Sequence, residues 1–150
     1  MRLIFPILFL LLLVAACTKK SDFTTKPQLK IKSVNSTVIS GDQTLEFIIQ
    51  LTDKEGDFTN YFGISTTTPN CPASDFTDSS LFVIPNDFID AKKNEGDIVL
   101  DLDKTTRHSN QCAGPGSSFL TDTTVYRFWT KDRAGNVSDT AISEPIIINP

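Results

Sequence analysis

The feature that most constrains the fold of this chain is an alternation of apolar and polar side chains with a period of two. In residues 45–52 and 97–103 every second residue is a large apolar one, and most residues between them are polar or charged. Successive side chains of a β-strand point to opposite faces, so this period predicts strands that each bury one face. No stretch after residue 20 has convincing helical spacing with capping residues. The alternation therefore favours an all-β fold.

Other segments rich in apolar and β-branched residues predict further strands. They are residues 29–34, 61–65, 81–84, 124–131 and 137–149, the last interrupted near Pro145. Clusters of Gly, Asn, Asp and Pro punctuate the chain at residues 40–42, 53–57, 85–87, 94–96 and 134–136. About seven short strands with frequent turns predict a single antiparallel β-sandwich, with a small closed barrel as the alternative.

The N-terminal residues predict export from the cytoplasm. Arg2 precedes an almost unbroken apolar run over residues 3–14. This run is shorter than the about 20 apolar residues that a membrane-spanning helix needs. The tetrapeptide at residues 14–17, Val-Ala-Ala-Cys, resembles a bacterial lipobox. The resemblance implies that residues 1–16 are a lipoprotein signal peptide, and that Cys17 carries a thioether-linked diacylglyceryl group after cleavage.

Lipidation would hold the mature chain on a membrane, because two or three acyl chains anchor a protein firmly. The resemblance further implies the outer membrane, since Thr18 rather than Asp follows the lipidated cysteine. Residues 17–27 are then the lipidated cysteine and a flexible tether, and residues 28–150 form one β-sandwich domain of ordinary single-domain size. The net charge of −4 at pH 7 disfavours nucleic acid as a partner.

Two cysteines remain for the exported domain. Cys71 and Cys112 both lie in surroundings typical of turns, and export would place them in an oxidising compartment. A disulfide between them is the first interpretation, and two free thiols are the alternative. The absence of a CxxC motif and the presence of a single histidine, His108, disfavour a metal or nucleophile role for this pair.

The turn at residues 53–57 is the candidate metal site. Asp53, Glu55 and Asp57 offer oxygen ligands, and Ca²⁺ binds six to eight oxygens in proteins. The turn does not match an EF-hand loop, because it lacks that loop's glycine at position six and glutamate at position twelve. A polar connection between two strands explains the same residues. The acids of residues 97–103 alternate with the apolar residues and are predicted to face water.

The C-terminal region resembles a known group of domains. Residues 125–138, VYRFWTKDRAGNVS, and the following Pro-Ile-Ile-Ile at 145–148 are similar to the final hairpin of bacterial immunoglobulin-like and fibronectin type III-like domains. Gly135 suits the positive φ of such a turn, and Asp132 and Asn136 suit hydrogen bonds to turn amides. Together with the lipobox and the turn at 53–57, this hairpin resembles the small immunoglobulin-like lipoproteins of the Bacteroidota. That resemblance implies location and fold more than mechanism.

Trp129, the only tryptophan, is the candidate for a binding surface. If Tyr126 and Phe128 face the core, Trp129 shares the outer face with Arg127 and Lys131. Trp and Arg are favoured at interfaces, and an exposed aromatic ring can stack on a sugar. The alternative is a structural role, with Trp129 inward or covered by the stems of Arg127 and Lys131.

No residue pattern predicts catalysis. His108-Ser109 has no nucleophile-elbow motif around it, and the glycines of residues 114–118 lack the lysine of a phosphate-binding loop. We therefore expect a lipid-anchored envelope protein that is not an enzyme and acts as a protein-interaction or structural accessory module, with an envelope protein as partner. The alternative is a carbohydrate-binding surface lipoprotein, calcium-dependent through residues 53–57, with a polysaccharide as partner.

Overall fold

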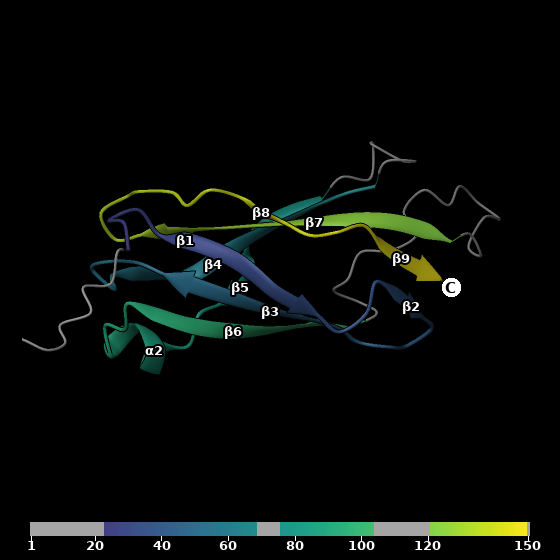
Figure 1. The fold of residues 1–150 in the computed structure, drawn as a ribbon, viewed down its shortest axis with the longest axis horizontal. Helices are drawn as coiled ribbons and strands as arrows, with labels where there is room; N and C mark the ends of the chain where they lie inside the picture. The colour runs from purple at the N-terminus through teal and green to yellow at the C-terminus, as the bar shows by residue number, and fades with distance from the viewer. Residues whose placement is uncertain (1–22, 69–75, 104–120, 150) are drawn as a thin grey trace, which may run out of the picture.

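Two separate β-sheets form the body of the protein in a computed structural model, which describes residues 23–68, 76–103 and 121–149 (Figure 1). One sheet has the strand order β1-β3-β6. The other has the order β2-β9-β7-β4-β5, and the short strand β8 also pairs with β7. The predicted all-β sandwich is confirmed, and the two separate sheets rule out the barrel.

The described residues contain nine strands and one short helix. The strands are β1 (Gln28–Val34), β2 (Val38–Ser40), β3 (Leu45–Thr52), β4 (Phe58–Thr67), β5 (Phe76–Val83), β6 (Glu95–Leu102), β7 (Asp122–Asp132), β8 (Ala141–Ile142) and β9 (Ile146–Asn149), and the helix is α2 (Asn86–Asp90). None of the ranges described includes a helix long and apolar enough to cross a membrane.

The chain crosses between the sheets several times, as in immunoglobulin-like sandwiches. Strands β1, β3 and β6 lie in one sheet, and the chain passes to the other sheet after each of them. The pairings are antiparallel except that of β2 with β9, which is parallel. The prediction of a purely antiparallel sandwich is therefore corrected at this edge, where a three-residue strand joins the second sheet.

The alternation of the sequence decides which side chains form the core. Leu45, Phe47, Ile49 and Leu51 of β3 are fully buried, and the residues between them are half-buried. In β7 the inward residues include Tyr126 and Phe128, whose ring centroids lie 5.3 Å and 5.2 Å from that of Phe47. Aromatic contacts across the two sheets therefore hold the middle of the sandwich together.

Helix α2 was not expected from the sequence, which predicted only a turn at residues 85–87. Pro85 has φ −55°, and its carbonyl accepts hydrogen bonds from the backbone N–H groups of Phe88 and Ile89. Ile89 is buried, which ties this turn of helix to the core. A helix of five residues is too short to produce a helical period in the sequence.

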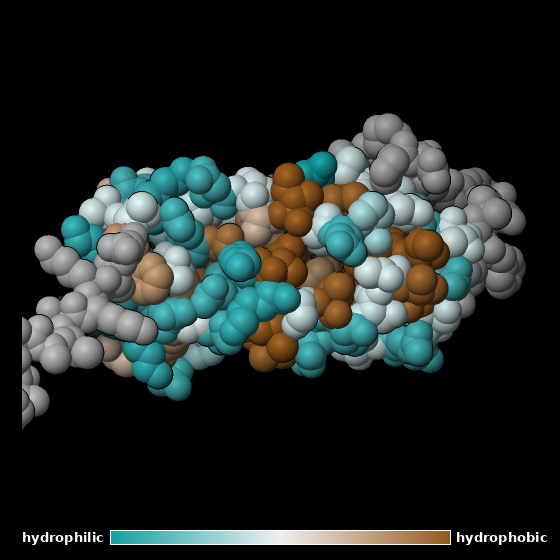
Figure 2. All heavy atoms as spheres, viewed as in Figure 1, coloured by the Kyte–Doolittle hydropathy of each residue, from teal (hydrophilic) through white to brown (hydrophobic). Residues whose placement is uncertain are grey.

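The two ends of the sandwich differ in surface chemistry. The N-terminal segment, the β3–β4 turn, the loop after β7 and helix α2 gather at one end, opposite the C-terminus (Figure 1). On the face drawn in Figure 2, this end is mostly hydrophilic, while hydrophobic residues gather in the middle and toward β2 and β9. The signal sequence, Cys17, Cys71 and Cys112 lie outside the described residues, so the predicted lipidation and disulfide stay predictions.

Candidate metal centre

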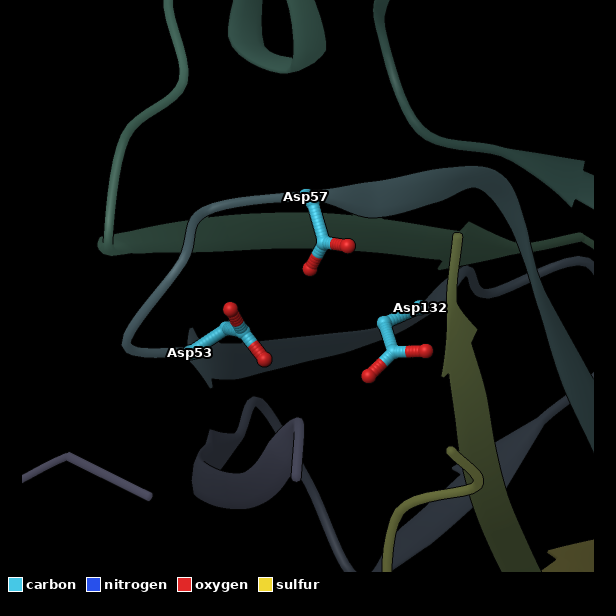
Figure 3. A group of neighbouring side chains, drawn as sticks. All are labelled: Asp53, Asp57 and Asp132. Carbon is cyan, nitrogen blue, oxygen red and sulfur yellow. The ribbon is translucent and has the colours of Figure 1, made fainter. Parts of the chain in front are cut away.

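Three aspartates meet at the end of the sandwich where the N-terminal segment enters. Asp53 follows β3, Asp57 precedes β4, and Asp132 is the last residue of β7. One carboxylate oxygen from each lies within 4.8 Å of the others. Figure 3 shows the three carboxylates facing a shared space. We call this group the aspartate cluster.

Asp53 continues the inward-facing positions of β3 and is fully buried. Its Oδ1 accepts hydrogen bonds of 2.8 Å from the backbone N–H groups of both Glu55 and Gly56, which shapes the turn. Its Oδ2 is buried and has no hydrogen-bond partner. A buried carboxylate oxygen without a partner is costly, because it has lost its water and gained nothing in exchange.

Burial raises the pKa of the Asp53 carboxyl above its ordinary value, because desolvation disfavours the charged form. The hydrogen bonds from Gly56 and Glu55 lower this pKa in part, and the nearby charges of Asp57 and Glu55 raise it. Among the described residues, the ion pairs are Lys26–Asp139 and Lys32–Asp97, and neither involves the aspartate cluster. Among the side chains in residues 23–68, 76–103 and 121–149, the cluster therefore has excess negative charge and no cationic side chain paired with it.

Asp132 is held rigidly by the turn that follows it. The side chain is almost fully buried, and its two oxygens accept hydrogen bonds from the backbone N–H and the side-chain Nδ2 of Asn136, at 2.7 Å and 2.6 Å. Gly135 has φ +96°, a conformation that favours glycine. The predicted turn hydrogen bond of Asp132 and the predicted positive φ of Gly135 are thus both present.

The turn that bears Asp53 and Asp57 is also fixed by close backbone packing. Gly56 has φ +63°, and a Cβ atom there would lie 2.7 Å from the backbone oxygen of Lys92. The backbone N–H of Asp53 donates to the carbonyl of Asn94 at 2.8 Å, and the Asn94 side chain donates to the carbonyl of Lys54. The loop between α2 and β6 therefore positions two of the three carboxylates before any ligand arrives.

An open cavity of about 210 Å³ adjoins the aspartate cluster. It is lined by Asp57 and Asp132, which belong to the cluster, and by Thr25, Glu55, Ala134 and Asn136. Every atom of these side chains that could coordinate a cation is an oxygen of a carboxylate, an amide or a hydroxyl group. An oxygen-only donor set suits a hard cation such as Ca²⁺ rather than Zn²⁺ or Cu²⁺, which prefer nitrogen and sulfur ligands.

The cluster differs from the ligand set considered in the sequence. Asp53 and Asp57 lie together, but Glu55 is exposed and lies outside the group, although it lines the adjoining cavity. The third member is Asp132, to which the sequence analysis assigned only a turn hydrogen bond. The sequence contained a signal for Asp132, since its position continues the inward face of β7 after Phe128 and Thr130, as Asp53 continues the inward face of β3 after Leu51.

Trp129 lies on the outer face of β7 together with Arg127 and Lys131, while Tyr126 and Phe128 are buried. Its cross-strand neighbour is Gly63 of β4, and a Cβ atom on Gly63 would lie 2.2 Å from the indole Cε2. The indole therefore covers the backbone of Gly63 and is half-buried there. This packing favours a structural role for Trp129.

Arg127 and Lys131, the two cations beside Trp129, have different surroundings. The guanidinium of Arg127 donates a hydrogen bond to the Thr67 hydroxyl, and the Lys131 side chain is exposed. A shallow cavity of about 150 Å³ is lined by Tyr61, Gly63, Trp129, Thr130, Lys131 and Val137. Of the three candidate surface residues, Trp129 and Lys131 line this cavity and Arg127 does not.

Comparison with known proteins identifies no family for this chain. No protein-family model matches the chain, and no curated protein matches it. One similar solved structure is the CARDB domain of the PF1109 protein from Pyrococcus furiosus, in complex with di-metal ions. It is 10% identical, with a TM-score of 0.33, and the match covers 85% of this chain and 96% of that chain. A similarity this low supports no conclusion about the present chain, and the di-metal ions belong to that protein.

Proposed function

We propose that this chain is a non-catalytic, calcium-binding β-sandwich of the cell envelope, held at the outer membrane by a lipid on Cys17. The observation that carries the calcium site is the Oδ2 atom of Asp53. It is buried without a hydrogen-bond partner, and its carboxylate faces those of Asp57 and Asp132 (Figure 3). Buried charges in proteins are normally paired or bound to a metal ion.

Calcium fits this site better than magnesium does. The aspartate cluster brings together one carboxylate oxygen from each of three residues, and the side chains lining the adjoining cavity provide further oxygens. Ca²⁺ accepts six to eight oxygens in flexible geometry, whereas Mg²⁺ demands near-ideal octahedral geometry and keeps several of its waters. An ion of charge +2 would also offset most of the charge of three ionised aspartates.

The position of the cluster supports a structural role for the ion. Asp53 follows β3 in one sheet, whereas Asp57 and Asp132 adjoin β4 and β7 in the other. An ion bound by all three would therefore join the two sheets at one end of the sandwich, where hydrophobic packing gives way to carboxylates. A metal ion that links the two sheets in this way suits an interaction or accessory module that must stay folded outside the cytoplasm.

The proposed location agrees with the affinity expected of such a site. The lipobox-like motif at Cys17 favours export, and calcium sites of extracellular modules commonly bind with dissociation constants of about 10⁻⁴–10⁻³ M. A site of this strength would be occupied where calcium is abundant. The chain would then act as a lipid-anchored module whose partner is another envelope protein.

Calorimetric titration of CaCl₂ into the full chain tests the proposal. We expect one site with a dissociation constant of about 10⁻⁴–10⁻³ M, weakened at least about tenfold by Asp53→Asn and by Asp132→Asn. Asp101→Asn, at an exposed position of β6 outside the cluster, is the matched control and should bind as the wild type does. The proposal would be overturned if no calcium binding is detected up to a free calcium concentration 10 times the upper end of this range of dissociation constants. It would also be overturned if Asp53→Asn binds calcium with the same affinity as the wild type.

A further inference from the structure

The N-terminal segment, residues 23–27, crosses the end of the sandwich that carries the aspartate cluster. Thr25 lies in the middle of this segment and lines the cavity next to Asp57 and Asp132. Of the described residues that line this cavity, Thr25 alone belongs neither to the β3–β4 turn nor to the end of β7 and the turn after it. The segment therefore brings a third part of the chain to the site.

The residues on both sides of Thr25 are already tied to the two turns that bear the aspartates. The carbonyl of Thr24 accepts a hydrogen bond of 3.0 Å from the backbone N–H of Lys54, within the turn between Asp53 and Asp57. The ammonium of Lys26 lies 2.5 Å from Oδ1 of Asp139, in the loop that follows Asp132. These two ties flank Thr25 and hold it against the cavity that it lines.

Both ties are weak on their own. The Lys26 and Asp139 side chains retain 43% and 85% of their exposure, and ion pairs so open to water contribute little. Thr24 and Thr25 are themselves exposed, and firm burial begins only at Pro27, next to β1. The segment is thus near the site but poorly fastened, so an additional bond at Thr25 would change its order.

We propose that Thr25 supplies an oxygen to the calcium ion held by Asp53, Asp57 and Asp132, so that calcium binding clamps residues 23–27 onto the sandwich. This inference rests on the proposed calcium site and adds to it a ligand and a consequence. Residues 23–27 are the second half of the predicted tether, so calcium would set how much of the tether is free. Fixing five residues shortens its reach by about 17 Å, at 3.3–3.6 Å for each extended residue.

Hydrogen exchange on the full chain tests the clamp directly. Exchange of the backbone amides of residues 24–26 is measured in EGTA and in saturating CaCl₂, and we expect calcium to slow it by about fivefold or more. MgCl₂ at the same concentration should slow it less. If the titration shows that calcium binds and the exchange of this segment is unchanged, the clamp is wrong and the calcium site stands. If calcium does not bind, both proposals fail.

A variant tests the same coupling in the reverse direction, since linkage is reciprocal. Thr25→Gly removes the side-chain hydroxyl and loosens the segment, so we expect calcium affinity to fall by about fivefold or more. Thr140→Gly, an exposed threonine outside the cavity wall, is the matched control and should keep wild-type affinity. Wild-type affinity in Thr25→Gly would overturn the clamp.

Discussion

The middle of the sandwich and its acidic end are built by the same strands on the same inward face, yet they differ in what stabilises them. In β3 the inward positions run from Leu45 to Leu51 and then reach Asp53, and in β7 they run through Tyr126 and Phe128 to Asp132. The middle excludes water with rings and aliphatic groups that need no partner. The end buries carboxylates, which do. The alternation of the sequence therefore determines which face of the sheet each side chain lies on. The chemical type of the side chain determines whether its burial stabilises the fold by itself or requires a bound ion.

The largest effect is expected in the middle. Phe47 is fully buried, with ring contacts to Tyr126 and Phe128 across the sandwich. Phe47→Ala removes these contacts and leaves a cavity, so we expect the free energy of unfolding to fall by about 3–5 kcal/mol. Urea denaturation of the full chain in EGTA and in CaCl₂ measures the loss.

The comparison predicts that this loss is independent of calcium, because Phe47 contacts the hydrophobic middle and not the aspartate cluster. Equal losses with and without CaCl₂ would support two separate sources of stability. A loss that changes greatly on adding CaCl₂ would show that the hydrophobic middle and the aspartate cluster are energetically coupled. The two regions would then not be separate sources of stability.

Calcium should have the next largest effect, at the acidic end. At a free calcium concentration 100 times the dissociation constant, a ligand that binds only the folded state adds about 2.7 kcal/mol to the free energy of unfolding. We expect this increment in the wild type and its loss in Asp53→Asn. Urea denaturation over a series of calcium concentrations gives the value.

Asp101→Asn again serves as the control, because its side chain is exposed on the opposite parity of β6. It should gain as much from calcium as the wild type does. Equal gains in Asp53→Asn and the wild type would mean that any bound calcium acts elsewhere on the chain.

The sequence predicts the middle of the sandwich much better than the acidic end. Regular alternation in residues 45–52 is a local signal, and it correctly predicted the buried face that includes Phe47. For residues 124–131 the sequence left open whether Phe128 or Trp129 faces inward, and the structure buries Phe128. The one-turn helix at Asn86–Asp90 and the three-residue strand β2 carry too few residues for any period, so they were missed.

The aspartate cluster could be predicted only in part. The sequence suggested Asp53, Glu55 and Asp57 as calcium ligands because they are two residues apart. Residues two apart share one face only when they lie in a β-strand, and these three lie in a turn. Gly56 has a positive φ and turns the chain, and Glu55 lies outside the group that Asp53, Asp57 and Asp132 form. Asp132 comes from a strand that only the sheet order brings near, although its inward parity was readable.

A moderate effect is expected on the outer face of the middle, at Gly63. A Cβ atom at this position would lie 2.2 Å from the Trp129 ring, so Gly63→Ala must displace the indole. We expect the free energy of unfolding to fall by about 1–3 kcal/mol, as in overpacked sites. Because Trp129 is the only tryptophan, its fluorescence should shift to the red as the ring becomes exposed.

This substitution sharpens the comparison, since it asks whether the middle is packed on both faces of the sheet. Ser65→Ala, at a half-buried position in the same strand, is a control that should leave the fluorescence unchanged. An unchanged spectrum and unchanged stability in Gly63→Ala would mean that the indole moves freely, which would restore its use as a binding surface.

The smallest effect is the pH dependence of the acidic end without calcium. Burial raises the pKa of Asp53 in the folded state above the ordinary value of 3.8, so the folded chain holds this proton more tightly than the unfolded chain. The resulting stabilisation is complete below the unfolded pKa and is lost as the pH rises through the folded pKa. Asp53→Asn keeps an oxygen to accept the hydrogen bonds of Glu55 and Gly56 but cannot ionise.

Urea denaturation of the wild type and Asp53→Asn in EGTA, from pH 4 to pH 7, isolates this contribution from those of the other acids. We expect the stability of Asp53→Asn to rise relative to the wild type as the pH increases. In CaCl₂ the trend should reverse, because the ion binds the ionised carboxylate and stabilises only the wild type. If the stabilities of the wild type and Asp53→Asn change in parallel with pH in EGTA, the charge of Asp53 is already compensated without calcium. The acidic end would then need no ion, and it would not differ from the hydrophobic middle in this respect.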